Sequence, residues 1–292
     1  MRVEVIEPHG FCSGVRAAVE MARHALSVHG EVWCLHELVH NGAVVDELRK
    51  KGMRFVECLE DVPEGGVVLF SAHGVAPCVR AQAAARRLKV VDATCPFVAR
   101  AHRQVREFSE RGVPVVVVGN AEHVEVIGLV GEYKGGKEFK VVRDAAAVGD
   151  LPFPEDGPVG VVCQTTLSSG TVQDVLSALR ARYPHLLESP ASDTCTATRD
   201  RQRAVGDFVR SGGPSTTGVL VIGSANSSNT ARLVEIAREA GAAAWRVDGP
   251  KELSSCDFAG IGRLGLTAGA STPESIVMGV AAAFDGKGCD VL

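Results

Sequence analysis

The sequence predicts an α/β protein built on mostly parallel sheets, and two patterns support this prediction. Short runs rich in valine, isoleucine and leucine alternate along the chain with segments whose apolar residues recur at helical spacing. The apolar runs are continuous, which is typical of strands that are buried on both faces of a parallel sheet. The clearest runs are residues 3–6, 31–35, 66–71, 88–93, 113–119, 158–164, 218–224 and 263–269.

Helices are expected between these runs. Residues 15–26 (VRAAVEMARHAL) and 172–183 (VQDVLSALRARY) place apolar side chains at i, i+3 and i+4, as an amphipathic helix does. The stretches around VVDATCP and ESPASD are the seams that we expect between α/β units. We expect the three units to span residues 1–95, 96–191 and 192–292.

Several strands run directly into loops of small polar residues. These stretches are VVLFSAHGV, VVVVGNAEHVEV, GVVCQTTLSSG, VLVIGSANSSNT and LGLTAGASTPE. In open α/β sheets, ligands bind at the carboxyl ends of the strands. The pattern therefore predicts several small sheets whose loops serve one shared site.

Composition argues against nucleic-acid-binding, membrane-spanning and secreted proteins. The chain has 292 residues, 46% of them hydrophobic, and a net charge of −4, which argues against a nucleic-acid partner. The chain contains no run of 18 or more apolar residues, so we expect no membrane span. The opening MRVEVIEPHG lacks the apolar core of a secretion signal. The nine cysteines are an odd number for a secreted disulfide framework, so we expect a cytoplasmic protein.

Three cysteines have matching surroundings. Cys12, Cys95 and Cys195 each end a short loop of small or polar residues, directly ahead of a helical segment. A helix N-terminus favours negative charge and so favours a thiolate there. The spacing fits one such cysteine in each of three similar units.

Three thiolates at one point favour an iron–sulfur cluster. Zinc sites usually take four ligands with CxxC pairs, and the chain has no such pair. A cluster held by three cysteines leaves one iron open to substrate. The alternative is that all three are small buried hydrophobic residues, as many cysteines are. We interpret the others as structural: Cys34, Cys58, Cys78, Cys163, Cys256 and Cys289.

An anion site is expected at the start of the helix in GSANSSNTARLVEIA. Ser227, Ser228 and Asn229 offer hydroxyl and amide groups beside the N–H groups of a helix start. N-capping explains one of the three residues, but hardly all of them. The segment Gly131–Lys137 matches G-x-x-x-x-G-K, yet Glu138 follows in place of Ser or Thr, so we do not interpret it as a phosphate loop.

At this point a family resemblance is clear. The chain resembles the 4-hydroxy-3-methylbut-2-enyl diphosphate reductases over nearly its full length. The shared motifs, in order, are GFCSGV, ELVHN, FSAHGV, DATCP, EHVEVIG, QTTLS, SSN and TAGAS. The resemblance implies three α/β domains around a central 4Fe–4S cluster held by Cys12, Cys95 and Cys195.

The same resemblance implies roles for the polar residues. Glu125 would be the proton source, and Thr165 would place a hydroxyl near the substrate alcohol. Without the motif, Glu125 is more simply a first-turn carboxylate that stabilises the helix dipole. The remaining residues would contact the substrate or hold its diphosphate: His40, His73, His123, Ser227, Ser228, Asn229 and Ser271.

The reaction implied is reductive removal of an allylic hydroxyl group, which yields isopentenyl and dimethylallyl diphosphates. Amino-acid side chains do not supply such electrons, so a cofactor has to. The chain has no G-x-G-x-x-G after a strand, and the family implies an external donor such as ferredoxin or flavodoxin. Two alternatives stay open at this stage, namely a redox-neutral iron–sulfur dehydratase and a non-catalytic iron–sulfur sensor.

Overall fold

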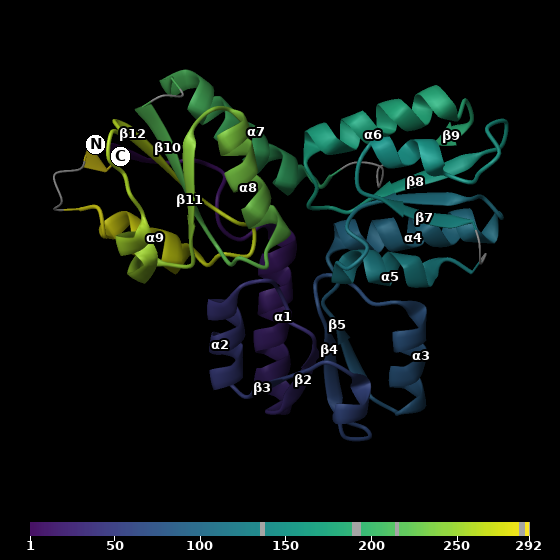
Figure 1. Ribbon diagram of the computed structural model, residues 1–292. Coiled ribbons are helices and arrows are strands. Elements are labelled where there is room, and N and C mark those ends of the chain that lie inside the picture. The colour runs from purple at the N-terminus through teal and green to yellow at the C-terminus, as the bar shows by residue number, and fades with distance from the viewer. Residues whose placement is uncertain (135–137, 189–193, 214–215, 286–289, 292) are drawn as a thin grey trace. The chain divides into compact units, whose positions relative to one another are not determined.

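The computed structural model describes residues 1–134, 138–188, 194–213, 216–285 and 290–291 (Figure 1). Its contacts divide the chain into two compact units. Unit 1 comprises Met1–Val15, His40–Val44 and Thr196–Leu292, and unit 2 comprises Arg16–Val39 and Val45–Cys195. Outside the described ranges lie Cys289, the end of the Gly131–Lys137 segment and the domain boundary expected at 191/192. The boundaries of the three domains stay a prediction.

Unit 1 contains a parallel five-stranded sheet whose order joins the two ends of the chain. The order is β11 (Ala243–Val247), β10 (Thr217–Ile222), β12 (Arg263–Ala268), β1 (Arg2–Val5) and β13 (Asp290–Val291). Strand β1 lies parallel to β12, with Arg2 opposite Arg263. The first strand of the chain is therefore held by strands from its last third.

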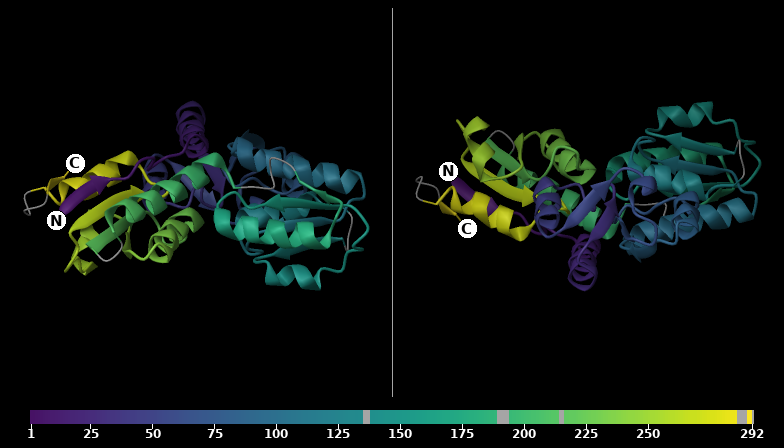
Figure 2. Two further views of the ribbon diagram at one scale, coloured as in Figure 1. Left: turned by 90° about the horizontal axis from the view of Figure 1, so that it is seen from above. Right: turned by 90° about the horizontal axis from the view of Figure 1, so that it is seen from below.

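Helices cover both faces of this sheet (Figure 2). Helix α9 (Glu274–Ala282) packs on the face to which Leu220 and Ile222 point. Val219 and Val221 point to the other face and pack with α7 and α8. These two helices span Thr196–Gly212 and Ser228–Glu239. Burial on both faces explains why β10 reads as a continuous apolar run.

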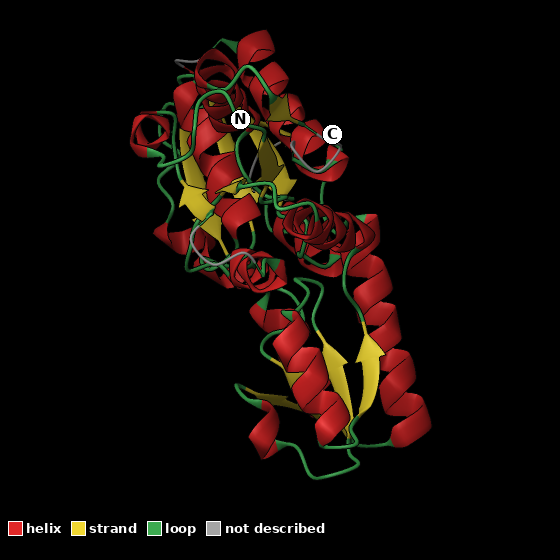
Figure 3. Ribbon diagram, turned by 90° about the vertical axis from the view of Figure 1, so that its right-hand side faces the viewer, coloured by secondary structure: helices red, strands yellow, loops and turns green. Residues whose placement is uncertain are grey.

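Unit 2 contains two parallel four-stranded sheets with flanking helices (Figure 3). The first has the order β3 (Met53–Val56), β2 (Val32–Leu35), β4 (Val67–Phe70) and β5 (Lys89–Asp92). The second has the order β7 (Phe139–Val142), β6 (Val115–Val118), β8 (Val159–Cys163) and β9 (Leu186–Leu187). The helices are α1 (Ser13–His29), α2 (Gly42–Lys50), α3 (Pro77–Ala85), α4 (Pro96–Glu110), α5 (Val124–Glu132) and α6 (Ser169–Arg182).

The second sheet of unit 2 shows how alternate side chains of a strand build two cores. Val115 and Val117 of β6 pack with side chains of α4 and α5, whereas Val116 and Val118 pack with those of α6. The prediction of an α/β fold with parallel sheets is confirmed, and each of the eight apolar runs forms a strand. In the described ranges no helix is long and apolar enough to cross a membrane.

Candidate functional site

The three cysteines stand at helix starts, as the sequence predicts. Helix α1 begins at Ser13, directly after Cys12, and α7 begins at Thr196, directly after Cys195. Cys95 is the N-cap residue of α4, with Pro96 at the first helical position. All three side chains are partly exposed, and the eight described cysteines form no disulfide.

Hydrogen bonds fix the backbone of each cysteine loop. The N–H of Cys12 donates to the carbonyl of Ala270 at 3.2 Å, and the N–H of Val15 points at the Cys12 Sγ at 3.4 Å. In unit 2, the Cys95 N–H donates to Ala72 at 3.0 Å, and the Cys195 N–H donates to Thr165 at 3.2 Å. Each cysteine is thus tied to a loop that carries another predicted site residue.

Glu125 and Thr165 form a buried pair in unit 2. The backbone N–H of Thr165 donates to Glu125 Oε1 at 2.8 Å, and its hydroxyl donates to Oε2 at 3.0 Å. Glu125 is 1% exposed. Burial raises the pKa of this carboxyl to about 7, although both hydrogen bonds from Thr165 act in the opposite direction. The side chain can therefore hold a proton near neutral pH and release it.

Two of the predicted histidines lie beside this pair. His123 is the N-cap of α5, and its Nδ1 accepts a hydrogen bond from the Glu125 N–H at 3.2 Å. The ring of His73 meets that of His123 edge to face, with 5.9 Å between ring centroids. The His73 Nδ1 also lies 3.3 Å from the Ser71 hydroxyl. Unit 2 thus gathers two thiols, two imidazoles and one buried acid.

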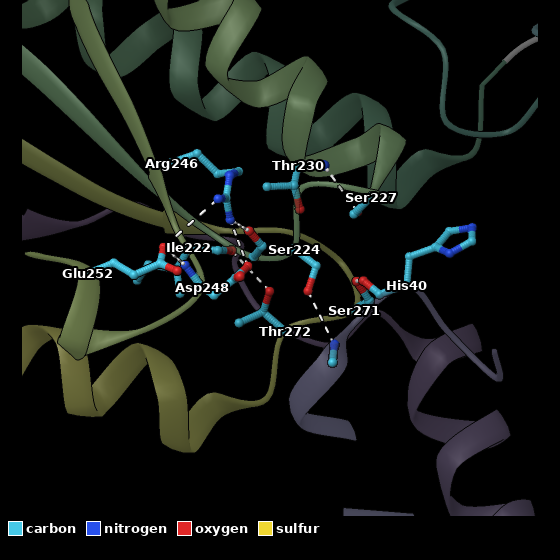
Figure 4. Close-up of polar contacts among 12 residues, drawn as sticks. His40, Ile222, Ser224, Ser227, Thr230, Arg246, Asp248, Glu252, Ser271 and Thr272 are labelled. Carbon is cyan, nitrogen blue, oxygen red and sulfur yellow. Dashed lines mark hydrogen bonds and ion pairs between the residues drawn. The ribbon is translucent and has the colours of Figure 1, made fainter. Parts of the chain in front are cut away.

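Unit 1 gathers the predicted anion-binding residues (Figure 4). Ser227 is the N-cap of α8, and its hydroxyl accepts from the Thr230 N–H at 3.3 Å. Ser228 is the first residue of α8 and is partly exposed. The Ser271 hydroxyl donates to the carbonyl of His40 at 2.9 Å. Since Ser271 follows Ala270, the loop that binds the Cys12 backbone also supplies this hydroxyl.

Asn229 gives the clearest sign of a ligand in unit 1. It is only 4% exposed, and neither its amide nitrogen nor its amide oxygen has a hydrogen-bond partner among the described residues. An unpaired buried amide costs about 1–3 kcal/mol. Such a group calls for a specific explanation, and a bound ligand that completes its hydrogen bonds is one.

Sequence reasoning missed three polar residues at these loops. The Ser224 hydroxyl accepts from the Gly42 N–H at 3.3 Å, which ties the loop after β10 to the segment His40–Val44 of the same unit. Arg246 donates to the Gly223 carbonyl at 3.0 Å. Arg201 is 4% exposed and donates to the Gly10 carbonyl at 2.8 Å. Ser224 belongs to a predicted polar loop, but no local pattern marks the two arginines.

The described side chains form no group of three His, Cys, Asp or Glu close enough together to hold a metal ion. The chemistry of the individual residues nevertheless suits a soft metal cofactor. Each of the three thiols stands at a helix start, and a backbone N–H points at one of them. Cysteine sulfur is a ligand that soft metals and iron–sulfur clusters take.

Fold and site together define a class of protein. Parallel sheets whose polar loops carry thiols, a buried acid, and hydroxyl and amide groups at a helix start are typical of an α/β enzyme that acts on a small molecule. The sequence model of the family described as "LytB protein" matches residues 3–285. The chain belongs to this family.

The names of similar proteins agree with the family that the sequence motifs indicate. A 4-hydroxy-3-methylbut-2-enyl diphosphate reductase of Desulfotalea psychrophila is 44% identical over 281 residues, which cover 96% of this chain and 88% of the relative. The 4-hydroxy-3-methylbut-2-enyl diphosphate reductase 2 of Burkholderia mallei is 42% identical over 277 residues, which cover 94% of this chain and 83% of the relative. The family resemblance inferred from the motifs is confirmed.

Solved structures lead to the same result. The structure of the E-1-hydroxy-2-methyl-but-2-enyl-4-diphosphate reductase from Plasmodium falciparum superposes with a TM-score of 0.93. It is 29% identical in sequence, and the match covers 100% of this chain and 91% of that one. The fold of the chain is therefore that of a reductase of this family.

Proposed function

We propose that the chain reduces (E)-4-hydroxy-3-methylbut-2-enyl diphosphate to isopentenyl and dimethylallyl diphosphates. The substrate takes up two electrons and two protons, its allylic C–O bond breaks, and the oxygen leaves as water. The observation that carries the proposal is the Glu125–Thr165 pair, a buried carboxyl with a pKa of about 7 bonded to a loop that also binds the backbone of Cys195.

For the electrons, we propose a 4Fe–4S cluster with Cys12, Cys95 and Cys195 as its ligands. When bound, such a cluster supplies electrons one at a time to the substrate. The chain's own part is to keep three thiolates ready at helix starts. The Asp92 carboxylate supports one of these loops, because it accepts from the Thr94 N–H at 3.0 Å and from the guanidinium of Arg80 at 2.7 Å.

For the protons, we propose Glu125 as the general acid and Thr165 as its contact to the substrate alcohol. The Thr165 hydroxyl donates to Glu125 in the structure, and it can turn to pass a proton to a bound hydroxyl group. His123 supports the acid through the Glu125 N–H, and His73 lies against His123. A protonated imidazole at these positions can donate to phosphate oxygens.

For the diphosphate, we propose the loop 223–229 together with Ser271 and His40. Support comes from the unpaired amide of Asn229 and from the N–H groups at the start of α8. The electron donor in this proposal is an external protein such as ferredoxin or flavodoxin. We place the enzyme in the cytoplasm, where a reducing environment keeps thiols available for metal.

The first experiment measures iron, sulfide and the visible spectrum after anaerobic purification. We compare wild type with Cys12→Ser, Cys95→Ser and Cys195→Ser, and Cys78→Ser is the matched control because Cys78 is exposed. The wild type and the control are expected to hold about four irons per chain, and each ligand variant to lose the cluster. A colourless wild type without iron after reconstitution would refute the proposal.

The second experiment measures turnover of the allylic diphosphate with and without a reductant. Turnover that needs no reductant would favour the redox-neutral dehydratase instead. Glu125→Gln keeps the size of the side chain but cannot donate the carboxyl proton, so kcat is expected to fall by about 10²–10⁴-fold. Its iron content should match that of wild type.

A further inference from the structure

The loop that leads from β10 to α8 begins at a clamped glycine. The Gly223 N–H donates to the Val247 carbonyl at 2.9 Å, and the Gly223 carbonyl accepts from Arg246 Nη1 at 3.0 Å. Gly223 has φ +149°, and a Cβ there would lie 2.5 Å from the Thr230 hydroxyl. Its backbone is therefore held on both sides at the point where the proposed diphosphate loop starts.

The Arg246 guanidinium also pairs with two carboxylates at the end of β11. Its Nη1 lies 2.7 Å from Asp248 Oδ1, and its Nη2 lies 3.9 Å from a Glu252 oxygen. The Asp248 N–H donates to the same Glu252 carboxylate at 2.9 Å. One positive charge thus faces two negative charges, and the same guanidinium contacts the Gly223 carbonyl.

A diphosphate brings further negative charge to this neighbourhood. Without Arg246, Asp248 and Glu252 would repel the anion, because like charges destabilise each other at the moderate dielectric of a protein surface. The Gly223 carbonyl would also lose its donor, and its oxygen could turn toward the anion. Arg246 therefore opposes two separate causes of weak diphosphate binding.

We propose that Arg246 is a positioning residue for the diphosphate, which fixes the Gly223 carbonyl and neutralises Asp248 and Glu252. The inference rests on the proposed function, since it assigns the loop 223–229 to the diphosphate. It adds a residue from a strand that no sequence motif marks. Arg246 acts through the loop and need not contact the substrate.

The test uses the cluster-loaded protein, with inorganic pyrophosphate as the probe in titration calorimetry. Arg246→Leu is expected to bind pyrophosphate about tenfold more weakly and to raise KM about tenfold, while kcat stays within about twofold. Arg238→Leu is the matched control, because Arg238 also donates to a backbone carbonyl, in this case that of Ala244 in β11, at 3.0 Å. The control should bind like wild type.

Two further variants separate the two effects of Arg246. Arg246→Lys keeps the positive charge and should lose only part of the pyrophosphate affinity. It also provides the test of the proposal if Arg246→Leu fails to fold. Adding Glu252→Gln to Arg246→Leu removes one repelling charge and should restore part of the affinity. Equal pyrophosphate affinity in wild type, Arg246→Leu and Arg246→Lys would overturn the inference. A wild type that binds no pyrophosphate would instead count against the proposed function.

Discussion

Glu125 and Glu132 lie two turns apart on helix α5, are both almost fully buried, and have pKa values shifted in opposite directions. Burial raises the pKa of both carboxyls. For Glu132, however, hydrogen bonds from His102 at 2.9 Å and Arg106 at 3.0 Å outweigh burial and hold its pKa below the ordinary value. Among the described residues, the Glu125 carboxyl accepts hydrogen bonds only from the uncharged N–H and hydroxyl of Thr165, so its pKa stays high. One helix thus carries an acid suited to proton transfer and a structural anion.

The two carboxyls should change stability with pH in opposite directions. Folded Glu125 keeps its proton up to about pH 7, whereas the unfolded group loses its proton near pH 4.5. As the pH rises from 4.5 to 7, the contribution of Glu125 to the free energy of unfolding therefore falls by about 3 kcal/mol. Folded Glu132 has a lowered pKa, so its contribution is present above the unfolded pKa and is lost on acidification. Urea unfolding at several pH values checks this prediction. Glu125→Gln should remove the loss of stability between pH 4.5 and 7. Glu132→Gln should remove the loss of stability on acidification.

Thr165→Val should move the pH dependence of turnover. The substitution removes the hydroxyl bond to Glu125 but keeps the backbone bond, so the carboxylate is less stabilised and its pKa rises further. The alkaline limb of the kcat profile is expected to shift to higher pH, and kcat to fall about tenfold or more. Thr166→Val is the matched control, since the Thr166 hydroxyl accepts from Gln164. An unmoved limb in Thr165→Val would contradict this prediction.

Asn229→Leu should separate stability from binding. Leucine has a similar size and leaves no unpaired amide, so the melting temperature is expected to stay the same or to rise by a few degrees. Pyrophosphate affinity should fall at least tenfold. Differential scanning fluorimetry and calorimetry on the same sample test both parts. A variant that is less stable and binds normally would assign Asn229 to the fold instead.

Arg201→Met should weaken retention of the cluster. The Arg201 guanidinium joins the first turn of α7, through the Ala197 carbonyl at 2.9 Å, to the Gly10 carbonyl in the loop of Cys12. Without this link the loop is less ordered, and iron loss to a chelator is expected to be several times faster. Arg203→Met is a suitable comparison, because Arg203 lies on the same helix and is exposed. Equal rates of iron loss in both variants would rule out this role.

The strands that sequence reasoning found and missed differ in where they lie in the sheets. Every central strand lies in an apolar run, and all of them except β1 are buried on both faces over most of their length. The five missed strands, β3, β7, β9, β11 and β13, are all sheet edges. Edge strands can mix apolar residues with exposed charged ones, and β3 does so with Arg54. β5 is the edge strand that its Val90-Val91 pair revealed.

The candidate site shows the same division between local and distant signals. Cys12, Glu125 and Asn229 stand beside helix starts, so local patterns and family motifs identified them. Arg201 and Arg246 act on the backbone of segments that are distant in sequence or lie on a neighbouring strand. Pairings of this kind depend on tertiary structure, and one sequence without its fold does not reveal them.

The pairing of β1 with β12 and β13 has a consequence for biosynthesis. Arg2 of β1 lies opposite Arg263 of β12 and Asp290 of β13, so translation delivers β1 about 260 residues or more before either partner strand. Unit 2 can fold on the ribosome while the sheet of unit 1 still lacks the strands that flank β1. The loop of Cys12, whose N–H needs the Ala270 carbonyl, has to wait for the same late segment. Assembly of unit 1 is therefore a late event in synthesis, and a nascent chain halted before Ala270 cannot form the Cys12 loop.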